Sequence, residues 1–236
     1  MSEDSISLNK YISNTGVCSR READQMIEMG RVMINGEVAK KGNRVFDGDN
    51  VTIDNKPLKR KPRPIYIALN KPPGITCTTD LKDRDNIISF VNHKQRIFPI
   101  GRLDKPSSGL ILLTNDGDIV NKILRVENQH EKEYIVTVNR VITNNFIARM
   151  SSGIPILGTM TKKCKVKRLG NQKFSIILTQ GLNRQIRRMC EHLGYNVMTL
   201  KRIRIMHLDI GNLKLGRWRN LTVKEISLLQ EKVSKK

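Results

Sequence analysis

The sequence predicts an α+β protein in two parts, a small N-terminal α/β module and a larger region in which strands and helices mix. Three observations lead to this prediction. Helix signals precede hairpin signals within residues 5–58, residues 59–64 read KRKPRP, and strand-like and helix-like segments follow one another over residues 65–236. Because proline lacks an amide hydrogen and disfavours helix, we expect residues 59–64 to be a basic linker between two domains.

The N-terminal segment carries the start signals of two helices. Ser7 precedes the apolar residues of a short helix. Ser19 and Glu22 fit a capping box, in which the serine covers an orphan amide and the glutamate reaches back. After the second helix, Asn35-Gly36 predicts a tight hairpin, and a strand is expected over 51–53.

The larger region is expected to open with a strand over 65–69. A second strand over 134–138 alternates cleanly and places Tyr134 on the same side as two valines. Thr143 is expected to cap a helix, and residues 222–225 form a second capping box that opens a C-terminal helix.

The stretch from Phe174 to Gly194 is expected to hold a strand, a turn and a helix capped by Asn183. Apolar residues at i, i+3, i+4 and i+7 predict one buried face of that helix. The opposite face is either a solvated basic surface or a set of contacts to RNA phosphates. Its arginines are Arg184, Arg187 and Arg188.

Charge is the strongest signal in the composition. The chain has 43 Lys and Arg against 22 Asp and Glu, which gives a net charge of +21 and a pI near 10.2. Residues 1–61 hold 11 basic and 9 acidic side chains, so most of the excess lies beyond them, and residues 161–204 hold 12 basic side chains and one acidic. A polyanionic partner is expected, because each phosphate contact releases counterions; a solvated basic surface is the alternative.

Several classes of protein are disfavoured. The longest apolar runs are too short to span a membrane, and the first residues lack the pattern of a secretory signal. The histidines and cysteines are dispersed without ligand spacing, so we expect neither a metal site nor a disulfide framework. The cysteines are interpreted as reduced thiols of a cytoplasmic protein: Cys18, Cys77, Cys164 and Cys190.

Three motifs stand in order along the chain: GRLD at 101–104 followed by GLILLTNDG, KEYIV at 132–136, and GLNRQIRRM at 181–189. They resemble the ribosomal RNA pseudouridine synthases of the RsuA, RluB, RluE and RluF family, and the flanking strings look most like the RluF branch. The N-terminal module resembles the small RNA-binding domain of ribosomal protein S-four, with its αL motif. The resemblance covers nearly the whole chain and implies a catalytic domain with a mixed, mainly antiparallel sheet flanked by helices.

The resemblance also implies a reaction and the residues that perform it. Pseudouridine formation breaks the N1–C1′ bond of uridine, turns the uracil and rejoins it through C5, so neither a cofactor nor a metal is needed. A carboxylate is required, as a nucleophile or as the base that takes a ribose proton. The resemblance assigns that role to Asp104, and it implies that Arg187 forms an ion pair with Asp104 and orients it. It also implies that Tyr134 stacks on the uracil and that Arg102 helps to extrude the uridine. Many relatives have threonine in place of Ser107, which keeps the hydroxyl.

Further RNA contacts are expected from Lys10, Arg20 and Arg21 in the N-terminal module, and from Arg184 and Arg188. The resemblance implies a monomer that acts on 23S rRNA, with tRNA as a candidate second substrate. Three alternatives remain: a related synthase for small-subunit rRNA, a non-catalytic RNA-binding factor of ribosome assembly, and a DNA-binding regulator. A carboxylate, a tyrosine and an arginine in one site would favour the enzyme, because binding alone needs no carboxylate beside RNA.

Overall fold

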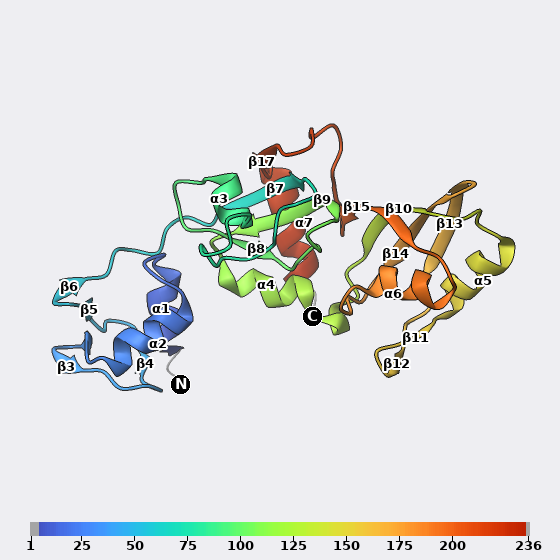
Figure 1. Ribbon diagram of the computed structural model, residues 1–236. Helices are drawn as coiled ribbons and strands as arrows, with labels where there is room; N and C mark the ends of the chain where they lie inside the picture. The colour runs from blue at the N-terminus through green and yellow to red at the C-terminus, as the bar shows by residue number, and fades with distance from the viewer. Residues whose placement is uncertain (1–4, 235–236) are drawn as a thin grey trace. The chain divides into compact units, whose positions relative to one another are not determined.

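The computed structural model describes residues 5–234, which divide into two compact units (Figure 1). One unit contains the chain up to Pro64 with the short segments Lys94–Arg96 and Asn115–Gly117, and the other contains the rest. Residues 58–65 carry no helix or strand. The flexibility expected of residues 59–64 stays a prediction. None of the helices between residues 5 and 234 has the length and apolarity that a bilayer crossing requires.

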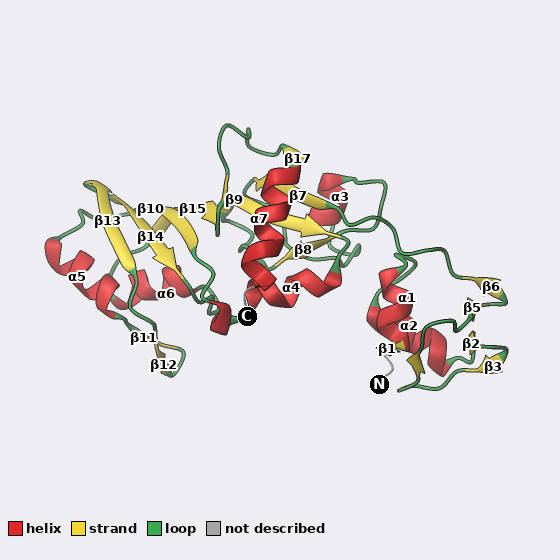
Figure 2. Cartoon of the chain, turned by 180° about the vertical axis from the view of Figure 1, so that it is seen from behind, coloured by secondary structure: helices red, strands yellow, loops and turns green. Residues whose placement is uncertain are grey.

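The N-terminal unit packs two helices against short strands (Figure 2). The strands pair as β1–β4 and in the order β3-β2-β5-β6. Its elements are β1 (Ile6–Ser7), α1 (Leu8–Asn14), α2 (Arg20–Glu28), β2 (Val32–Ile34), β3 (Glu37–Val38), β4 (Arg44–Val45), β5 (Val51–Ile53) and β6 (Lys56–Pro57).

The local signals of this unit are confirmed except for one. Ser19 and Glu22 form both bonds of the capping box at the start of α2. Asn35 and Gly36 have the positive φ angles, 52° and 87°, that the hairpin between β2 and β3 requires. Ser7 stands at the N-cap of α1 but makes no capping bond, because its hydroxyl donates to Asn9 Oδ1 instead.

The second unit is built on a nine-stranded sheet with the order β13-β14-β10-β15-β9-β7-β17, to which β8 and β16 add at β9 and β15. Every pairing is antiparallel except β15 with β9, so the predicted fold class is confirmed. A separate two-stranded sheet is formed by β11 and β12. The strands of the unit are β7 (Tyr66–Lys71), β8 (Phe98–Ile100), β9 (Ser108–Thr114), β10 (Lys132–Val138), β11 (Pro155–Ile156), β12 (Thr159–Met160), β13 (Lys165–Gly170), β14 (Lys173–Leu178), β15 (Val197–Ile205), β16 (Leu208–Asp209) and β17 (Trp218–Asn220).

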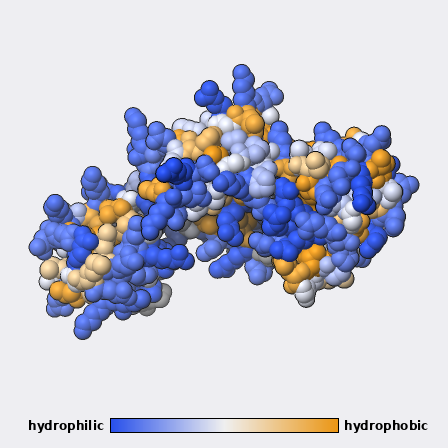
Figure 3. Space-filling model, in the orientation of Figure 1, coloured by the Kyte–Doolittle hydropathy of each residue, from blue (hydrophilic) through white to orange (hydrophobic). Residues whose placement is uncertain are grey.

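Helices cover both faces of this sheet (Figures 1 and 2). Leu110 and Leu112 of β9 pack in one apolar cluster with α4 and α7, whereas Ile111 and Leu113 pack in another with α3. A third cluster joins β10 and β14 to α5 and α6. The helices are α3 (Ile87–Val91), α4 (Gly117–Leu124), α5 (Asn144–Ser152), α6 (Gln185–His192) and α7 (Val223–Ser234), with a 3-10 turn over Val126–Asn128. Hydrophilic side chains cover most of the face in Figure 3.

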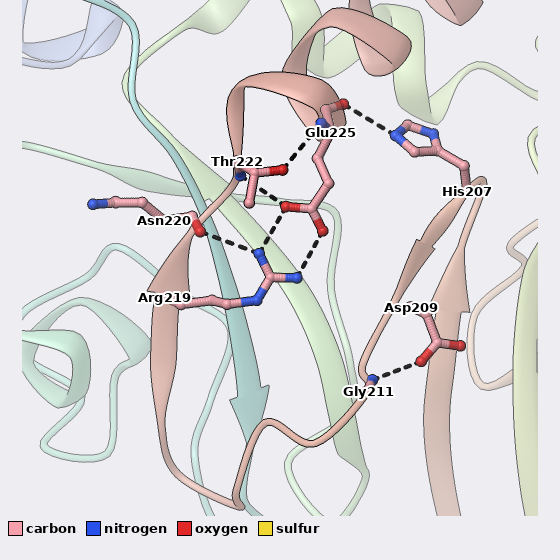
Figure 4. A network of polar contacts seen from close by, with 7 residues as sticks. All are labelled: His207, Asp209, Gly211, Arg219, Asn220, Thr222 and Glu225. Carbon is pink, nitrogen blue, oxygen red and sulfur yellow. Dashed lines mark hydrogen bonds and ion pairs between the residues drawn. The ribbon is translucent and has the colours of Figure 1, made fainter.

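The predicted caps of this unit also form. Thr143 accepts a hydrogen bond from the amide of Phe146 at the start of α5. At α7, the amide of Glu225 donates to the Thr222 hydroxyl, and the amide of Thr222 donates to the Glu225 carboxylate (Figure 4). The same carboxylate forms a two-pronged ion pair with Arg219, with both distances 2.7 Å. The start of α7 is therefore joined to strand β17 by a charged network.

Candidate active site

Asp104 lies in the loop that connects β8 to β9. Gly101 has a φ of +76°, and the amide of Ser107 donates to the carbonyl of Asp104, so the loop turns tightly before the buried strand begins. The amide of Gly74 donates to the carbonyl of Lys105 and ties the loop to the turn after β7. The Asp104 side chain keeps 30% of its surface exposed, which leaves its carboxylate accessible.

Arg187 of α6 reaches this loop from the other half of the sheet. Its Nε lies 3.5 Å from Asp104 Oδ2, an ion-pair distance without a hydrogen bond. Nη2 donates to the Ser107 hydroxyl at 3.2 Å, and Nη1 donates to the carbonyl of Val197 at 3.3 Å. These contacts fix the Arg187 guanidinium beside the Asp104 carboxylate. The Ser107 hydroxyl contributes by accepting a hydrogen bond from Arg187.

Helical periodicity grouped Arg187 with Arg184 and Arg188 on the face opposite the apolar residues. Arg187 is buried, because α6 packs on the apolar cluster on one side and on the Asp104 loop on another, and it lies beside Asp104 as the resemblance implies. The predicted cap of α6 is wrong. Asn183 does not cap the helix. Arg184 is the N-cap residue, with φ 50° and no capping bond, and Asn183 accepts two hydrogen bonds from Arg188 instead.

Tyr134 lies on β10, where it packs against two of the apolar clusters and also lines a cavity of about 620 Å³. Asp104 is the single carboxylate among the described residues that line this cavity. Five cationic side chains line it as well, namely Arg102, Lys105, Lys132, Arg184 and Arg202. A largely basic cavity of this size fits an anionic ligand that carries one flat ring, such as a nucleotide.

Burial changes the ionisation of groups around the cavity. Lys71 is fully buried, and its ammonium donates to the carbonyls of Pro72 and Ile75, both at 2.8 Å. Burial lowers the pKa of Lys71, whereas Cys77 and Asp104 nearby oppose that shift. Burial also raises the pKa of Cys77, so this residue lines the cavity as a neutral thiol.

Three cations at this site were not predicted from the sequence: Lys71, Lys132 and Arg202. Lys132 begins the KEYIV motif, and Lys71 begins a Lys-Pro-Pro-Gly turn, so both carried a signal that could have been used. Arg202 carried none, because it lies in a basic strand and is buried where that strand pairs with both β9 and β10.

The predicted RNA-binding residues fall into two groups. Arg102 and Arg184 line the cavity, and Arg188 lies beside it on α6, bonded to Asn183. The others lie in the N-terminal unit, on α1 and α2: Lys10, Arg20 and Arg21. Arg20 donates to Asn9 Oδ1 at 3.3 Å and is otherwise exposed.

Comparison with known proteins decides the family. Residues 65–192 match the family model described as RNA pseudouridylate synthase, and residues 7–51 match the S4 domain. The chain belongs to the RNA pseudouridylate synthase family. It is therefore an RNA pseudouridine synthase, an isomerase, with an N-terminal RNA-binding domain.

Relatives of this pseudouridine synthase include the dual-specificity RNA pseudouridine synthase RluF of Escherichia coli K12. That protein is 57% identical over 226 residues, which cover 95% of this chain and 78% of the relative. The ribosomal large subunit pseudouridine synthase B of Bacillus subtilis is 35% identical over 94% of this chain and 95% of its own length. A crystal structure of a pseudouridylate synthase superimposes with a TM-score of 0.70 at 30% identity, over 95% of this chain and 99% of the other.

Proposed function

We propose that this pseudouridine synthase isomerises a specific uridine of 23S rRNA, acts on a tRNA as a second substrate, and uses Asp104 as its catalytic carboxylate. One observation carries the residue assignment: among the described residues, Asp104 alone brings a carboxylate to the cavity. The names of the relatives support the substrate assignment, since one is called dual-specific and another a large-subunit synthase.

The arrangement supplies what the reaction needs. Arg187 stabilises the carboxylate of Asp104 and fixes its position, so that an oxygen can attack the base or sugar or remove a ribose proton. Tyr134 offers a ring on which an extruded uracil stacks. Arg102, exposed at the cavity, helps to hold the uridine outside its stack.

Affinity for RNA comes from two sources in this proposal. The basic residues around the cavity contact phosphates of the target strand, and the N-terminal unit contributes Lys10, Arg20 and Arg21. We propose that the protein works as a monomer in the cytoplasm. A non-catalytic assembly factor would need no carboxylate held by a buried arginine in a basic cavity.

The test is a map of pseudouridines in rRNA and tRNA from cells with and without the gene, repeated with purified protein on unmodified transcripts. The proposal predicts one 23S position and one tRNA position that lose pseudouridine without the gene and regain it with the protein. Loss confined to small-subunit rRNA would contradict the substrate assignment. Unchanged maps in every RNA, together with no modification of the transcripts, would contradict the proposal as a whole.

A further inference from the structure

Arg202 is a buried cation for which the described residues provide no ion pair. Only 3% of the residue is exposed, and its Nε donates to the carbonyl of Leu110 at 2.7 Å. Its Nη2 is buried and has no hydrogen-bond partner among the described residues. A buried guanidinium is costly unless it is paired. Because Arg202 also lines the cavity, a bound ligand is the natural source of the missing acceptor.

The sheet places Arg202 next to the ring that would stack on the base. Arg202 of β15 is the direct partner of Tyr134 on β10, so the two side chains leave the same face of the sheet as neighbours. Lys132 precedes Tyr134 by two residues and also lines the cavity.

The position of Arg202 is fixed by Gly109, its partner on the parallel strand β9. A Cβ atom at Gly109 would lie only 2.2 Å from the carbonyl oxygen of Arg202, and the φ of Gly109 is +107°. Only glycine permits this approach. The same contact brings β15 to the start of β9, the strand that follows the Asp104 loop. The backbone therefore fixes Arg202 relative to the loop that carries Asp104.

Two cations, Lys71 and Lys132, lie near Arg202. They are close enough that Arg202 opposes their protonation, although burial is the larger cause of their lowered pKa values. The pKa of Lys132 falls to about 8. Cys77 also lies near Arg202, and the nearby carboxylate of Asp104, which faces Lys71, is already paired with Arg187. The free protein therefore keeps an excess of positive charge at the inner wall of the cavity.

The reaction generates a negative charge that such a wall can stabilise. When the C1′–N1 bond breaks, its electron pair stays with N1, and the charge of the uracil anion spreads over N1, O2 and O4. C1′ meanwhile bonds to an Asp104 oxygen, or the sugar loses its 2′ proton to that oxygen, and either change is reversed when C5 bonds to C1′. After the base turns, C5 bonds to C1′, the C5 proton is lost and N1 regains a proton, so the product is an isomer of the substrate. Stabilising charge that develops in the transition state is the largest effect available to most enzymes.

We propose that Arg202, supported by Lys132, is a catalytic residue that stabilises the uracil anion as the C1′–N1 bond breaks. This inference rests on the proposed function and adds a role that Asp104 does not perform. It also accounts for an unpaired guanidinium in the resting protein, because its partner forms only during the reaction.

The experiment measures cleavage of the target nucleoside in a single turnover at saturating enzyme, for the wild type and for Arg202→Met. Two RNA fragments differ only at the target, which carries uridine or 5-fluorouridine. Fluorine withdraws electrons and stabilises the base anion, so 5-fluorouracil depends less on the protein for stabilisation. We expect Arg202→Met to lose about 100-fold in rate on uridine, the range for removal of one such donor, and clearly less on 5-fluorouridine.

The matched control is Lys201→Met, which removes an exposed cation from the adjacent position on the same strand. Lys201 does not line the cavity, so its removal should leave the single-turnover rate at saturating enzyme unchanged on both RNAs. Lys132→Met changes a less buried position. It should lose less rate than Arg202→Met, and again more on uridine than on 5-fluorouridine. This variant provides the test if Arg202→Met does not fold.

Three results would overturn the inference. They are equal losses on both RNAs, unchanged cleavage on both, or a loss confined to affinity, which would indicate a phosphate contact. Failure of the wild type to convert uridine in rRNA or tRNA would instead overturn the proposed function, and with it this inference.

Discussion

The two units differ in their buried charges, although both carry exposed ion pairs, such as Lys105 with Asp85 in the second unit. In the N-terminal unit, cations meet acids at the surface: Arg31 pairs with Asp54 and Lys41 with Glu28, and all four side chains are largely exposed. In the catalytic unit, Arg187 and Arg202 are buried around a cavity with one carboxylate. Exposed pairs contribute about 0–1 kcal/mol to stability, whereas buried charges strongly affect stability and chemistry. The comparison indicates that the first unit serves affinity and the second serves catalysis.

The largest effect is expected from Asp104→Asn, which removes the negative charge and keeps the size of the side chain. Turnover should fall by about 10⁴-fold or more, because the cavity loses its carboxylate. Melting temperature and RNA affinity should stay close to those of the wild type, with binding slightly tighter because one charge that repels phosphate is gone. Pseudouridine yield, a melting curve and a binding curve measure the three quantities.

Arg187→Met should reduce both activity and stability. It leaves the Ser107 hydroxyl and the Val197 carbonyl without their donor, and the Asp104 carboxylate without its ion-pair partner. We expect a loss of about 1–3 kcal/mol in the free energy of unfolding, with turnover reduced at least as strongly. Arg188→Met is the matched control, since Arg188 bonds only to Asn183 at the surface; it should change stability by less than about 0.5 kcal/mol. Equal stability losses in the two variants would mean that burial of Arg187 does not matter.

Removal of residues 1–58 should weaken RNA binding by about tenfold or more and make it less dependent on salt, because phosphate contacts are lost with Lys10, Arg20 and Arg21. Affinity measured between about 50 and 200 mM salt gives both quantities. An unchanged salt slope would show that the N-terminal unit does not contact phosphate.

The smallest effect concerns Glu225 at the start of α7. Its ion pair with Arg219 lowers its pKa to about 2, so its contribution to stability is full above the ordinary carboxyl pKa near 4.5 and is lost as the pH falls towards 2. Glu225→Gln should destabilise the protein by about 1–2 kcal/mol at neutral pH, since solvent screens the partly exposed pair.

The difference between wild type and Glu225→Gln should shrink as the pH falls from about 4.5 and vanish below about 2, where Glu225 is protonated in the folded protein as well. Trp218, the single tryptophan of the chain, precedes Arg219 and reports unfolding by fluorescence. Glu191→Gln, which removes an exposed carboxylate from α6, is the control for the loss of one negative charge. A constant difference across this range would contradict the assignment of the low pKa to the pair.

Local signals predicted the parts of the fold that depend on near neighbours. The capping boxes at Ser19 and Thr222 and the Asn35-Gly36 hairpin need only a few adjacent residues, and all of them form. The resemblance in three motifs supplied the family, which periodicity alone does not specify. Asn183 failed as a cap because Arg188, one turn later, occupies its side chain.

Burial of the site arginines could not be predicted from local pattern, because it depends on contacts between distant segments. Arg187 meets Ser107 across 80 residues of sequence, and Arg202 meets Leu110 across 92. Helical periodicity placed Arg187 with Arg184 on the face opposite the apolar residues. Periodicity carries no information about the Asp104 loop, which packs on α6 at Arg187. The parallel pairing of β15 with β9 brings Arg202 to the strand that follows the Asp104 loop.

One measurement tests the central claim, that catalysis resides in the cavity and the N-terminal unit adds affinity. Pseudouridine formation on one 23S fragment is followed in a single turnover at saturating protein, for Asp104→Asn and for residues 59–236 without substitution. We expect the Asp104→Asn variant to bind the RNA and to form no detectable pseudouridine. The protein that consists of residues 59–236 should need a higher concentration to saturate the RNA and should then react at close to the full-length rate. Near wild-type turnover by a folded Asp104→Asn variant would contradict it.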